Sequence, residues 1–284
     1  MQHGELTERI RRVIGELPPT MRRVAQFMDR NPVEVVALSA AELAEALGTS
    51  DATIVRTAKA LGYSGLSELK RSLTRELSQG TPVDNFQRTL QISDADALRA
   101  GLQSIKSTNE ILHGLASGAS AQVLERMICR LDSGQRIALF GLGPSAHVVQ
   151  YGAHQLRRQG RAALLLDATG RDLADRMLQL APGDVLLMLS YSVPNGEAWA
   201  VVDEALMHSI PILLITNSQD NPLIRKVDEA IALPRGGARG MALNGASFAF
   251  LEALLVGLSV RAPARTDAGL AKLERYRTNI DRLG

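Results

Sequence analysis

The chain has 284 residues, of which 45% are hydrophobic and 22% charged, values typical of a globular protein of about two domains. Its formal net charge of +2 excludes a strongly basic overall field, so any contact with nucleic acid must come from a local arrangement of charge. The single cysteine, Cys129, excludes an internal disulfide and a cysteine-rich metal site. The apolar runs are too short to cross a membrane and the N-terminus lacks a signal core, so we expect a cytoplasmic protein with no membrane partner.

The first 77 residues show the periodicity of helices alone. Apolar residues recur every three or four positions in "LTERIRRVIGEL", "TMRRVAQFMDRN", "SAAELAEALG", "SDATIVRTAKALG" and "GLSELKRSLTREL". Residues that commonly begin or end helices flank these segments, namely Thr20, Ser39, Ser50 and Ser64 at the starts and Gly48 and Gly62 at the ends. We therefore expect an all-helical N-terminal domain over residues 1–77.

Within this domain, "AAELAEALGTSDATIVRTAKAL" at residues 40–61 has the spacing of a DNA-binding helix-turn-helix. Ala44 lies where two helices cross closely, Gly48 lies in the turn, and Ile54 faces inward from the second helix. This spacing predicts residues 51–61 as the recognition helix. An ordinary helical hairpin, with no role in DNA binding, is the alternative interpretation of the same pattern.

The outward face of the predicted recognition helix carries the candidate DNA contacts. They combine a helix N-terminus with short polar and cationic side chains, and they are Ser50, Asp51, Ala52, Thr53, Arg56 and Lys59, together with Lys70 on the next helix. Arg56 is suited to a bidentate contact with a guanine edge, while Ser50 and Thr53 suit a phosphate or a nearby base. Lys59 and Lys70 are expected to contact phosphates. Asp51 would oppose phosphates, and capping of the helix is the alternative role for it.

The second half of the chain has a different rhythm. "SQGTPVDN" at residues 78–85 predicts a linker, residues 78–104 being this linker and the start of a connecting helix, and helices are expected near 94–116 and 120–131. Five apolar runs then alternate with helical segments: "RIALF", "AALLLD", "DVLLMLS", "PILLIT" and "EAIAL". Because continuous hydrophobicity indicates strands covered on both faces, we expect an α + α/β chain whose second domain, residues 105–284, has a five-stranded parallel sheet flanked by helices and ends in a polar helix.

The loop after the first strand, "FGLGPSA", is the first candidate ligand contact. Gly141 and Gly143 flank a tight strand-to-helix turn and a helix begins near Ser145, so backbone N–H groups are expected to face an anion. The same loop fits the dinucleotide fingerprint, with Ala146 as its third member and Asp167 as the acid for a ribose. A turn with a purely structural role is a further alternative.

The third strand ends in Ser190 and Ser192, which form the second candidate ligand contact. Because parallel strands present their carboxyl ends at one rim, both serines are expected to converge with Ser145 near one crevice. A phosphorylated small molecule would account for both loops, whereas a dinucleotide needs only the first. A simple stop signal for the strand is the alternative explanation of the serines.

Together the two halves resemble one family. "NP", "LSAAELA", "ATIVR" and "LGYSGLSELK" in the first half, and "FGLGPSA", "LSYS" and "ITNSQDNPL" in the second, are similar to transcriptional regulators of the RpiR/MurR type over residues 4–75 and 105–262. The resemblance implies an N-terminal helix-turn-helix that binds double-stranded operator DNA through residues 50–59. It also implies a C-terminal sugar-isomerase (SIS) domain that senses a phosphorylated sugar or related metabolite, and assembly into a homodimer or homotetramer through that domain. No cofactor and no metal are expected.

Three positions depart from the family pattern. The family loop after the third strand runs roughly S-x-S-G-x-T, but Val193 replaces its glycine and Asn195 its threonine. Asn195 still donates hydrogen bonds to an oxygen anion, so we keep it among the ligand contacts. Thr57 stands where the family generally has an aromatic residue packed against the recognition helix, and Tyr63 is the candidate to compensate.

A sugar-phosphate isomerase or epimerase with a helical appendage is the alternative function. Isomerisation needs a general base, and Glu197 is the nearest candidate, although an acid in the first turn of a helix is also a common partner of the helix dipole. His147 and His154 lack an evident carboxylate partner or metal-binding pattern and are expected to pack or to lie on the surface. Trp199 is expected to anchor a helix to the sheet. We expect a regulator without catalysis, because the helix-turn-helix has no evident use in an enzyme.

Overall fold

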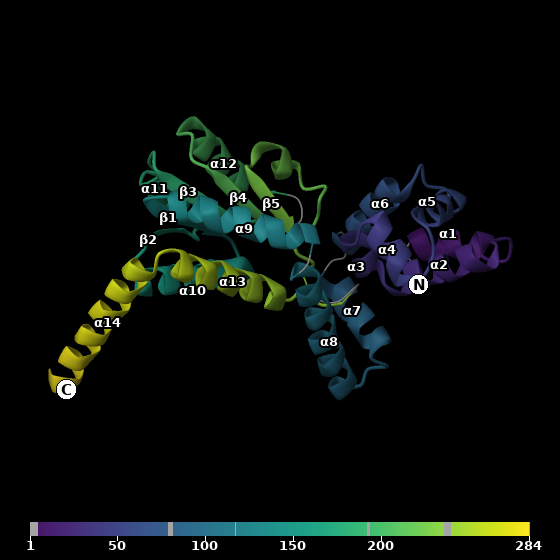
Figure 1. The fold of residues 1–284 in the computed structure, drawn as a ribbon, viewed down its shortest axis with the longest axis horizontal. Coiled ribbons are helices and arrows are strands. Elements are labelled where there is room, and N and C mark those ends of the chain that lie inside the picture. The colour runs from purple at the N-terminus through teal and green to yellow at the C-terminus, as the bar shows by residue number, and fades with distance from the viewer. Residues whose placement is uncertain (1–4, 79–81, 117, 192–193, 236–239, 284) are drawn as a thin grey trace. The chain divides into compact units, whose positions relative to one another are not determined.

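The computed structural model describes residues 5–78, 82–116, 118–191, 194–235 and 240–283. They form two compact units (Figure 1). One comprises Met1–Gly114, Asn217–Asp220 and Pro234–Leu243, and the other comprises Leu115–Thr216, Asn221–Leu233 and Asn244–Gly284.

The first unit is helical. Its helices are α1 (Glu5–Val13), α2 (Pro19–Arg30), α3 (Pro32–Ala37), α4 (Ala40–Ala46), α5 (Asp51–Ala60), α6 (Leu66–Ser78), α7 (Pro82–Ile92) and α8 (Ala97–Leu115). The five predicted helices are confirmed as α1, α2, α4, α5 and α6, and α3 is an additional short helix. The predicted linker over residues 78–85 is wrong from Pro82 onward, because the first turn of a helix accepts proline and α7 begins there.

The helix-turn-helix is held by one apolar core shared by α1 to α6. Leu43 and Ile54 are fully buried in it, and Ala44 is buried at the crossing of α4 and α5, as the spacing predicted. The start of α4 is fixed by a reciprocal pair of bonds: Ser39 Oγ accepts from the Glu42 N–H at 3.2 Å, and Glu42 Oε2 accepts from the Ser39 N–H at 2.7 Å.

The second unit is an α/β domain. Its elements are α9 (Gly118–Ser133), β1 (Arg136–Gly141), α10 (Pro144–Arg158), β2 (Ala162–Leu166), α11 (Gly170–Met177), β3 (Asp184–Leu189), α12 (Gly196–Met207), β4 (Ile212–Thr216), the 3₁₀ helix η1 (Pro222–Lys226), β5 (Glu229–Ala232), α13 (Gly245–Arg261) and α14 (Pro263–Leu283). In the described residues the sheet has five parallel strands in the order β2-β1-β3-β4-β5. All five predicted strands and the fold class are confirmed.

Both faces of the sheet are covered. One apolar cluster joins strand side chains such as Leu139 and Leu187 to α9, α10 and α13. The other joins the alternate strand side chains, such as Phe140 and Met188, to α11 and α12. Trp199 packs against this second cluster and anchors α12 to the sheet, as predicted. The result is a three-layer sandwich whose strands read as continuous apolar runs because neither face meets water.

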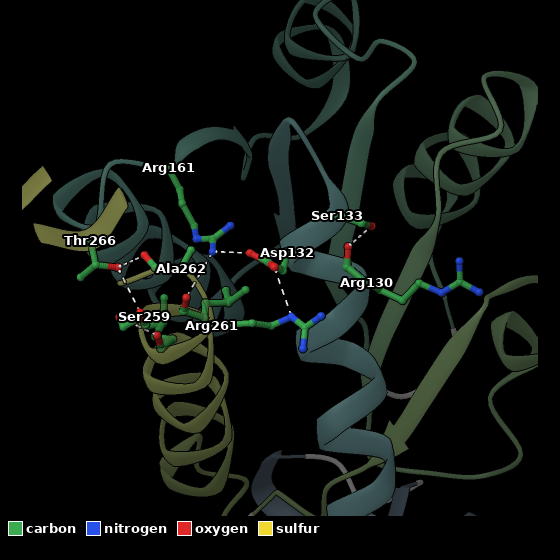
Figure 2. A network of polar contacts seen from close by, with 10 residues as sticks. Arg130, Asp132, Ser133, Arg161, Ser259, Arg261, Ala262 and Thr266 are labelled. Atoms are coloured by element: carbon green, nitrogen blue, oxygen red, sulfur yellow. Dashed lines mark hydrogen bonds and ion pairs between the residues drawn. The ribbon is translucent and has the colours of Figure 1, made fainter. Parts of the chain in front are cut away.

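An ion network ties helices together near the amino ends of β1 and β2 (Figure 2). Asp132, at the end of α9, accepts from Arg161 at 2.6 Å and from Arg261, at the end of α13, at 3.2 Å. Arg161 is itself buried and also donates to the Leu258 carbonyl at 3.2 Å. These contacts, with the hydrogen bond from Arg161 as the main cause, hold the pKa of the Asp132 carboxyl below its usual value. The network lies at the amino ends of the strands. The carboxyl ends of the strands lie at the opposite end of the sheet, which we call the carboxyl rim.

The expected C-terminal helix is present as α14. In the described chain, α14 has no buried residue, and Figure 1 shows it leaving the body of its unit. No single helix of the described residues is long and apolar enough to cross a membrane. By length and composition alone, α13 and α14 pass that test only as a bent pair that meets at 104°.

Candidate functional site

The N-terminus of α5 is built by its own sequence. Gly48 adopts a φ of +57° in the turn, a conformation that glycine takes without strain. Ser50 then caps the helix, because its Oγ accepts from the Thr53 N–H at 3.3 Å and lies 3.0 Å from Thr53 Oγ1. The predicted recognition helix over residues 51–61 is thus present as α5.

One face of α5 brings most of the predicted DNA contacts together. Ser50, Asp51, Ala52, Arg56 and Lys59 are exposed and Thr53 is half-buried. Arg56 Nε donates to the carbonyl of Ala52 at 3.2 Å, so its guanidinium lies along the helix toward the N-terminus. The face therefore presents two cations and two hydroxyls beside a helix N-terminus, a combination suited to bases and phosphates.

Lys70 does not share this arrangement. Its ammonium donates to the carbonyl of Leu38, and its side chain is half-buried. Burial lowers the pKa of the Lys70 ammonium, an effect that the nearby Glu42 carboxylate opposes. The bond to Leu38 uses one of the three N–H groups of the ammonium, so Lys70 helps to pack α6 and is not the free, exposed cation that the sequence suggested.

Arg9 supports the C-terminus of α5, a role that the sequence alone did not indicate. Its Nη1 donates to the carbonyls of Leu61 at 3.2 Å and Gly62 at 2.8 Å, at the C-terminus of α5. Its guanidinium also lies 4.4 Å from the centroid of the Tyr63 ring. Tyr63 is buried in the apolar core of this unit, and Thr57 is fully buried with its hydroxyl donating to the Thr53 carbonyl at 2.8 Å. No local sequence pattern predicts the Arg9 contact, since it joins residues more than fifty positions apart.

In the second unit, strand register brings the candidate ligand loops side by side. Gly141, the last residue of β1, pairs with Leu189, the last residue of β3, and Leu189 pairs with Ile215 of β4. The loops after these strands consequently leave the carboxyl rim at neighbouring positions. Ser145 lies in the first turn of α10 and Ser190 directly follows β3, and both are buried.

The first loop is a close-packed turn. A Cβ on Gly141 would lie 2.8 Å from the carbonyl oxygen of Ser145, and Gly143 has a φ of +55°. The N–H groups of Ser145 and Ala146 donate to the carbonyls of Leu142 and Gly143 at 3.1 and 3.0 Å. The expectation that the N–H groups of this turn face an anion is therefore wrong for these two, and Pro144 has none. The Ser145 hydroxyl is the side-chain group of this turn that can donate a hydrogen bond to a ligand.

The second loop is fixed through the backbone of Ser190. Its N–H donates to the Ile215 carbonyl at 3.0 Å, and its carbonyl accepts from Asn221 Nδ2 at 3.1 Å. Asn221 Nδ2 also donates to Thr216 Oγ1 at 2.9 Å, and both residues are buried. Sequence reasoning missed Asn221 as a support, although it lies in the "NPL" phrase of the family resemblance.

The rest of this loop is described only in part. Ser192 and Val193 lie outside the described residues. Tyr191 hydrogen-bonds through its hydroxyl to Ser247 in α13. Asn195 is exposed and caps α12, with its Oδ1 accepting from the Ala198 N–H at 3.0 Å. The amide nitrogen of Asn195 takes no part in this cap, so its N–H groups can donate to a ligand.

The structure disfavours a dinucleotide at this rim. The Asp167 carboxylate accepts from Gln150 Nε2 at 2.6 Å and from Arg176, and its side chain is only 8% exposed. The acid that a ribose would need is thus already bound by protein.

Glu197 lies in the first turn of α12, where its charge complements the helix dipole.

Comparison with known proteins identifies the family. Residues 4–80 match the model of the helix-turn-helix domain of the rpiR family, and residues 131–257 match that of the SIS domain. The chain is 30% identical over 278 residues to the uncharacterized HTH-type transcriptional regulator YfhH of Escherichia coli K12, covering 95% of each protein. The chain belongs to the RpiR family of transcriptional regulators. The predicted family and its two-part organisation as a regulator are confirmed.

Two further similarities place this RpiR-family chain more broadly. It is 27% identical over 258 residues to the bifunctional protein glk of Paraburkholderia xenovorans (strain LB400), covering 89% of this chain but 40% of that protein. The chain thus spans less than half the length of the glk relatives that it matches. The solved structure of the Vibrio vulnificus NanR protein complexed with ManNAc-6P shares its fold, with a TM-score of 0.52 and 22% identity over 97% of this chain and 98% of that chain.

Proposed function

We propose that this RpiR-family regulator binds operator DNA through α5 and that its SIS domain senses a phosphorylated sugar or a related metabolite. Binding of that effector would modulate operator binding and so control genes of carbohydrate metabolism. One observation carries the proposal: the same chain has an exposed polar and cationic face on α5 and serine-bearing loops at the carboxyl ends of the strands of an SIS sheet. The NanR protein, which shares the fold, forms a complex with the sugar phosphate ManNAc-6P, and this supports the choice of effector class.

The DNA half of the proposal assigns roles by position on α5. Arg56 reads a base edge, because its planar guanidinium can donate two parallel hydrogen bonds. Lys59 contacts phosphate, and the Ser50 and Thr53 hydroxyls contact phosphate or a neighbouring base at the helix N-terminus. The chain acts as a homodimer or homotetramer, so two recognition helices meet the two halves of a palindromic operator.

The effector half assigns neutral donors to the oxygen atoms of the ligand. The hydroxyls of Ser145, Ser190 and Ser192 and the amide nitrogen of Asn195 donate to them, while Gly141 and Gly143 let the first loop approach closely. No catalytic step is proposed. An isomerase with Glu197 as general base is the second candidate, and half-buried Glu197, two residues past Asn195, is the observation in its favour.

A gel-shift assay with the DNA upstream of its own gene tests the DNA half. Arg56→Ala is expected to weaken specific binding by about 1–3 kcal/mol, the worth of a bidentate base contact, or roughly 5- to 150-fold in Kd. Arg11→Ala, at an exposed position of α1, is the matched control and should bind like the wild type. Lack of specific binding at low and moderate salt, combined with turnover of a sugar phosphate, would favour the isomerase instead.

A thermal-shift screen of sugar phosphates, sugars, polyols and acids tests the effector half. Ser190→Ala is expected to leave the fold intact, since the bonds that fix this residue use its backbone. The same change should reduce the stabilisation that a true effector confers. A ligand whose stabilisation is unchanged in both Ser190→Ala and Ser192→Ala would show that the effector binds elsewhere.

A further inference from the structure

Three helices begin beside the candidate ligand loops, and their N-termini differ. In α10, the N–H groups of Ser145 and Ala146 are bound within their own turn. In α12, Asn195 caps the helix and Glu197 adds a carboxylate to the first turn. Helix α13 has neither feature, because its N-cap residue, Asn244, makes no side-chain cap and its first turn holds no acid. Of the three, the N-terminus of α13 is therefore the one best suited to an anion.

The first N–H groups of α13 are buried without an acceptor. The first bond of this helix runs from the Phe248 N–H to the Asn244 carbonyl at 3.0 Å. No contact within the described residues uses the N–H groups of Gly245, Ala246 and Ser247. Ala246 and Ser247 are nevertheless only 4% and 1% exposed. Because a buried N–H group without an acceptor destabilises the fold, this helix end is suited to a ligand that supplies acceptors.

The same end of α13 holds a buried acceptor. Asn244 Oδ1 is buried and has no hydrogen-bond partner in the described part of the chain. An amide oxygen accepts hydrogen bonds, so it is suited to a hydroxyl or N–H group of a ligand. The helix end thus offers donors for an anionic group and an acceptor for a hydroxyl, and anionic sugar derivatives carry both groups.

The loop after β3 reaches this end of α13. The Tyr191 hydroxyl hydrogen-bonds to Ser247 Oγ in the first turn of the helix. Tyr191 directly follows Ser190, whose hydroxyl takes part in no contact among the described residues although Ser190 is only 8% exposed. A proposed effector contact therefore lies on the segment that is bonded to the first turn of α13.

Helix α10 brings Ser145 to the same place. Helices α10 and α13 pack side by side (Figure 1), and a Cβ on Gly152 would lie 3.0 Å from Leu251 Cδ2. Ser145 lies seven residues before Gly152 on α10, and Asn244 lies seven residues before Leu251 on α13. Since seven residues make about two turns, Ser145 and Asn244 lie on the facing sides of their helices.

Ser145 is also a buried group without a partner. It is 4% exposed, and no hydrogen bond of the described chain uses its hydroxyl. It lies on the face of α10 that meets α13, near the N-terminus of each helix. The Ser145 hydroxyl and the first-turn N–H groups of α13 are thus independent donors at one place, and both lack an acceptor.

We propose that the N-terminus of α13 is the anion-binding part of the effector site. The first-turn N–H groups of α13 and the hydroxyls of Ser145 and Ser190 donate to an oxygen anion of the effector. Asn244 Oδ1 accepts from a hydroxyl or N–H group of the same ligand. This inference rests on the proposed function, because it names the wall of that effector site against which the charged group lies. The effector is then an anionic sugar derivative, and a neutral sugar or polyol leaves the N–H groups without their anion.

Asn244→Asp tests the proposal in the full-length chain, with inorganic phosphate as the probe. The new carboxylate caps the free N–H groups and repels phosphate, so the Tm without phosphate should rise. Millimolar phosphate should raise the Tm of the wild type above that in chloride of equal ionic strength, and this response should be at least halved in Asn244→Asp. Asn279→Asp, at an exposed position of α14, is the matched control for charge and should respond like the wild type. Asn244→Ala adds no charge and leaves the N–H groups in place, so it should keep most of the response.

The outcomes separate this inference from the proposed function. A wild type that does not respond to phosphate, or an Asn244→Asp response equal to that of the wild type, overturns the anion site at α13. A loss in Asn244→Ala as large as in Asn244→Asp also overturns it, because the effect would then not arise from charge. A lower Tm of Asn244→Asp without phosphate contradicts the free N–H groups.

Ser190→Ala distinguishes the two failures. If Ser190→Ala lowers the phosphate response and Asn244→Asp does not, the effector site at the carboxyl rim stands and α13 is not its anion-binding wall. If neither variant lowers the response, phosphate binds elsewhere and the proposed effector site fails as well.

Discussion

Gly141→Ala is the sharpest test of how the fold positions the candidate ligand site. Gly141 ends β1, and a Cβ there would lie 2.8 Å from the Ser145 carbonyl oxygen and 3.1 Å from Val149 Cγ1. The nearer neighbour is backbone in the first turn of α10, which cannot yield as the end of a flexible side chain does. The helix must therefore move away from β1, and Ser145, a proposed ligand contact, moves with it.

The expected magnitude follows from overpacking. Adding a methyl group to a well-packed site costs about 1–3 kcal/mol. At about 2–4 °C per kcal/mol for a unit of this size, the Tm of the SIS unit should fall by about 2–12 °C. The stabilisation conferred by an effector should fall as well, because the Ser145 hydroxyl leaves its position.

Gly196→Ala is the matched control for this change. Gly196 begins α12 near the same rim, and a Cβ there would meet no atom within 4 Å. Alanine at this helical position should leave the Tm unchanged or raise it slightly, because the free energy of unfolding can rise by about 0.4–1 kcal/mol. Thermal unfolding followed by circular dichroism measures both variants. If Gly141→Ala unfolds at the same temperature as Gly196→Ala, the close approach of α10 to β1 does not constrain the loop.

Three further predictions concern single side chains. Asp132 has its pKa lowered mainly by Arg161, so its contribution to stability is present above the unfolded pKa of about 3.9 and is lost as pH falls through the lower folded value. Urea unfolding should thus show wild type more stable than Asp132→Asn at pH 7, with the gap closing below pH of about 4, whereas a gap that persists at low pH contradicts this. Lys70→Met should leave the salt dependence of operator binding unchanged, while Lys59→Met should reduce the slope of log K against log salt by about 1, and equal effects would contradict the assignment. Asn195→Asp should keep the Tm of the apo protein, because aspartate caps helices equally well. It should lower the affinity for an anionic effector, measured by calorimetry, because the new carboxylate repels the anion. Unchanged affinity would remove Asn195 from the site.

The fold was predictable where local pattern and tertiary structure agree. Continuous apolar runs predicted the five strands because both faces of the sheet are covered, so the burial is visible in the sequence itself. The helix-turn-helix was predictable for a similar reason: Ser39 and Ser50 cap the helices that follow them, and Gly48 takes a positive φ in the turn. Each of these signals acts within a few residues.

Composition gave a wrong prediction where a linker and the first turn of a helix share the same residue types. The stretch at residues 78–85 is small, polar and proline-containing, as linkers are, yet α7 begins at Pro82. Proline in the first turn of a helix costs little, because the N–H that it lacks would have no partner within the helix. Lys70 misled differently: its spacing suited an exposed cation, but the carbonyl that it reaches belongs to Leu38, 32 positions away.

For the candidate site, the sequence predicted the location better than the chemistry. Strand order and register place the loops after β1 and β3 at adjacent positions, as parallel topology requires. The sequence could not show which polar atoms were already used. The N–H groups of Ser145 and Ala146 are bound within their own turn, and Asp167 is bound by Gln150 and Arg176. Such assignments depend on contacts that only the folded chain creates.

The replacement of threonine by Asn195 changes what the loop can offer a ligand. A hydroxyl offers one donor and two lone pairs, whereas Asn195 offers two amide N–H donors and an Oδ1 that already accepts from the Ala198 N–H, so donation is its main contribution. The other side-chain donors in the proposed site are serine hydroxyls, so such a site would select oxygen-rich ligands by the placement of neutral hydrogen bonds. The proposed DNA face would depend instead on the charges of Arg56 and Lys59. Added salt screens charge far more than neutral hydrogen bonds, so it should weaken operator binding while affecting the effector site much less.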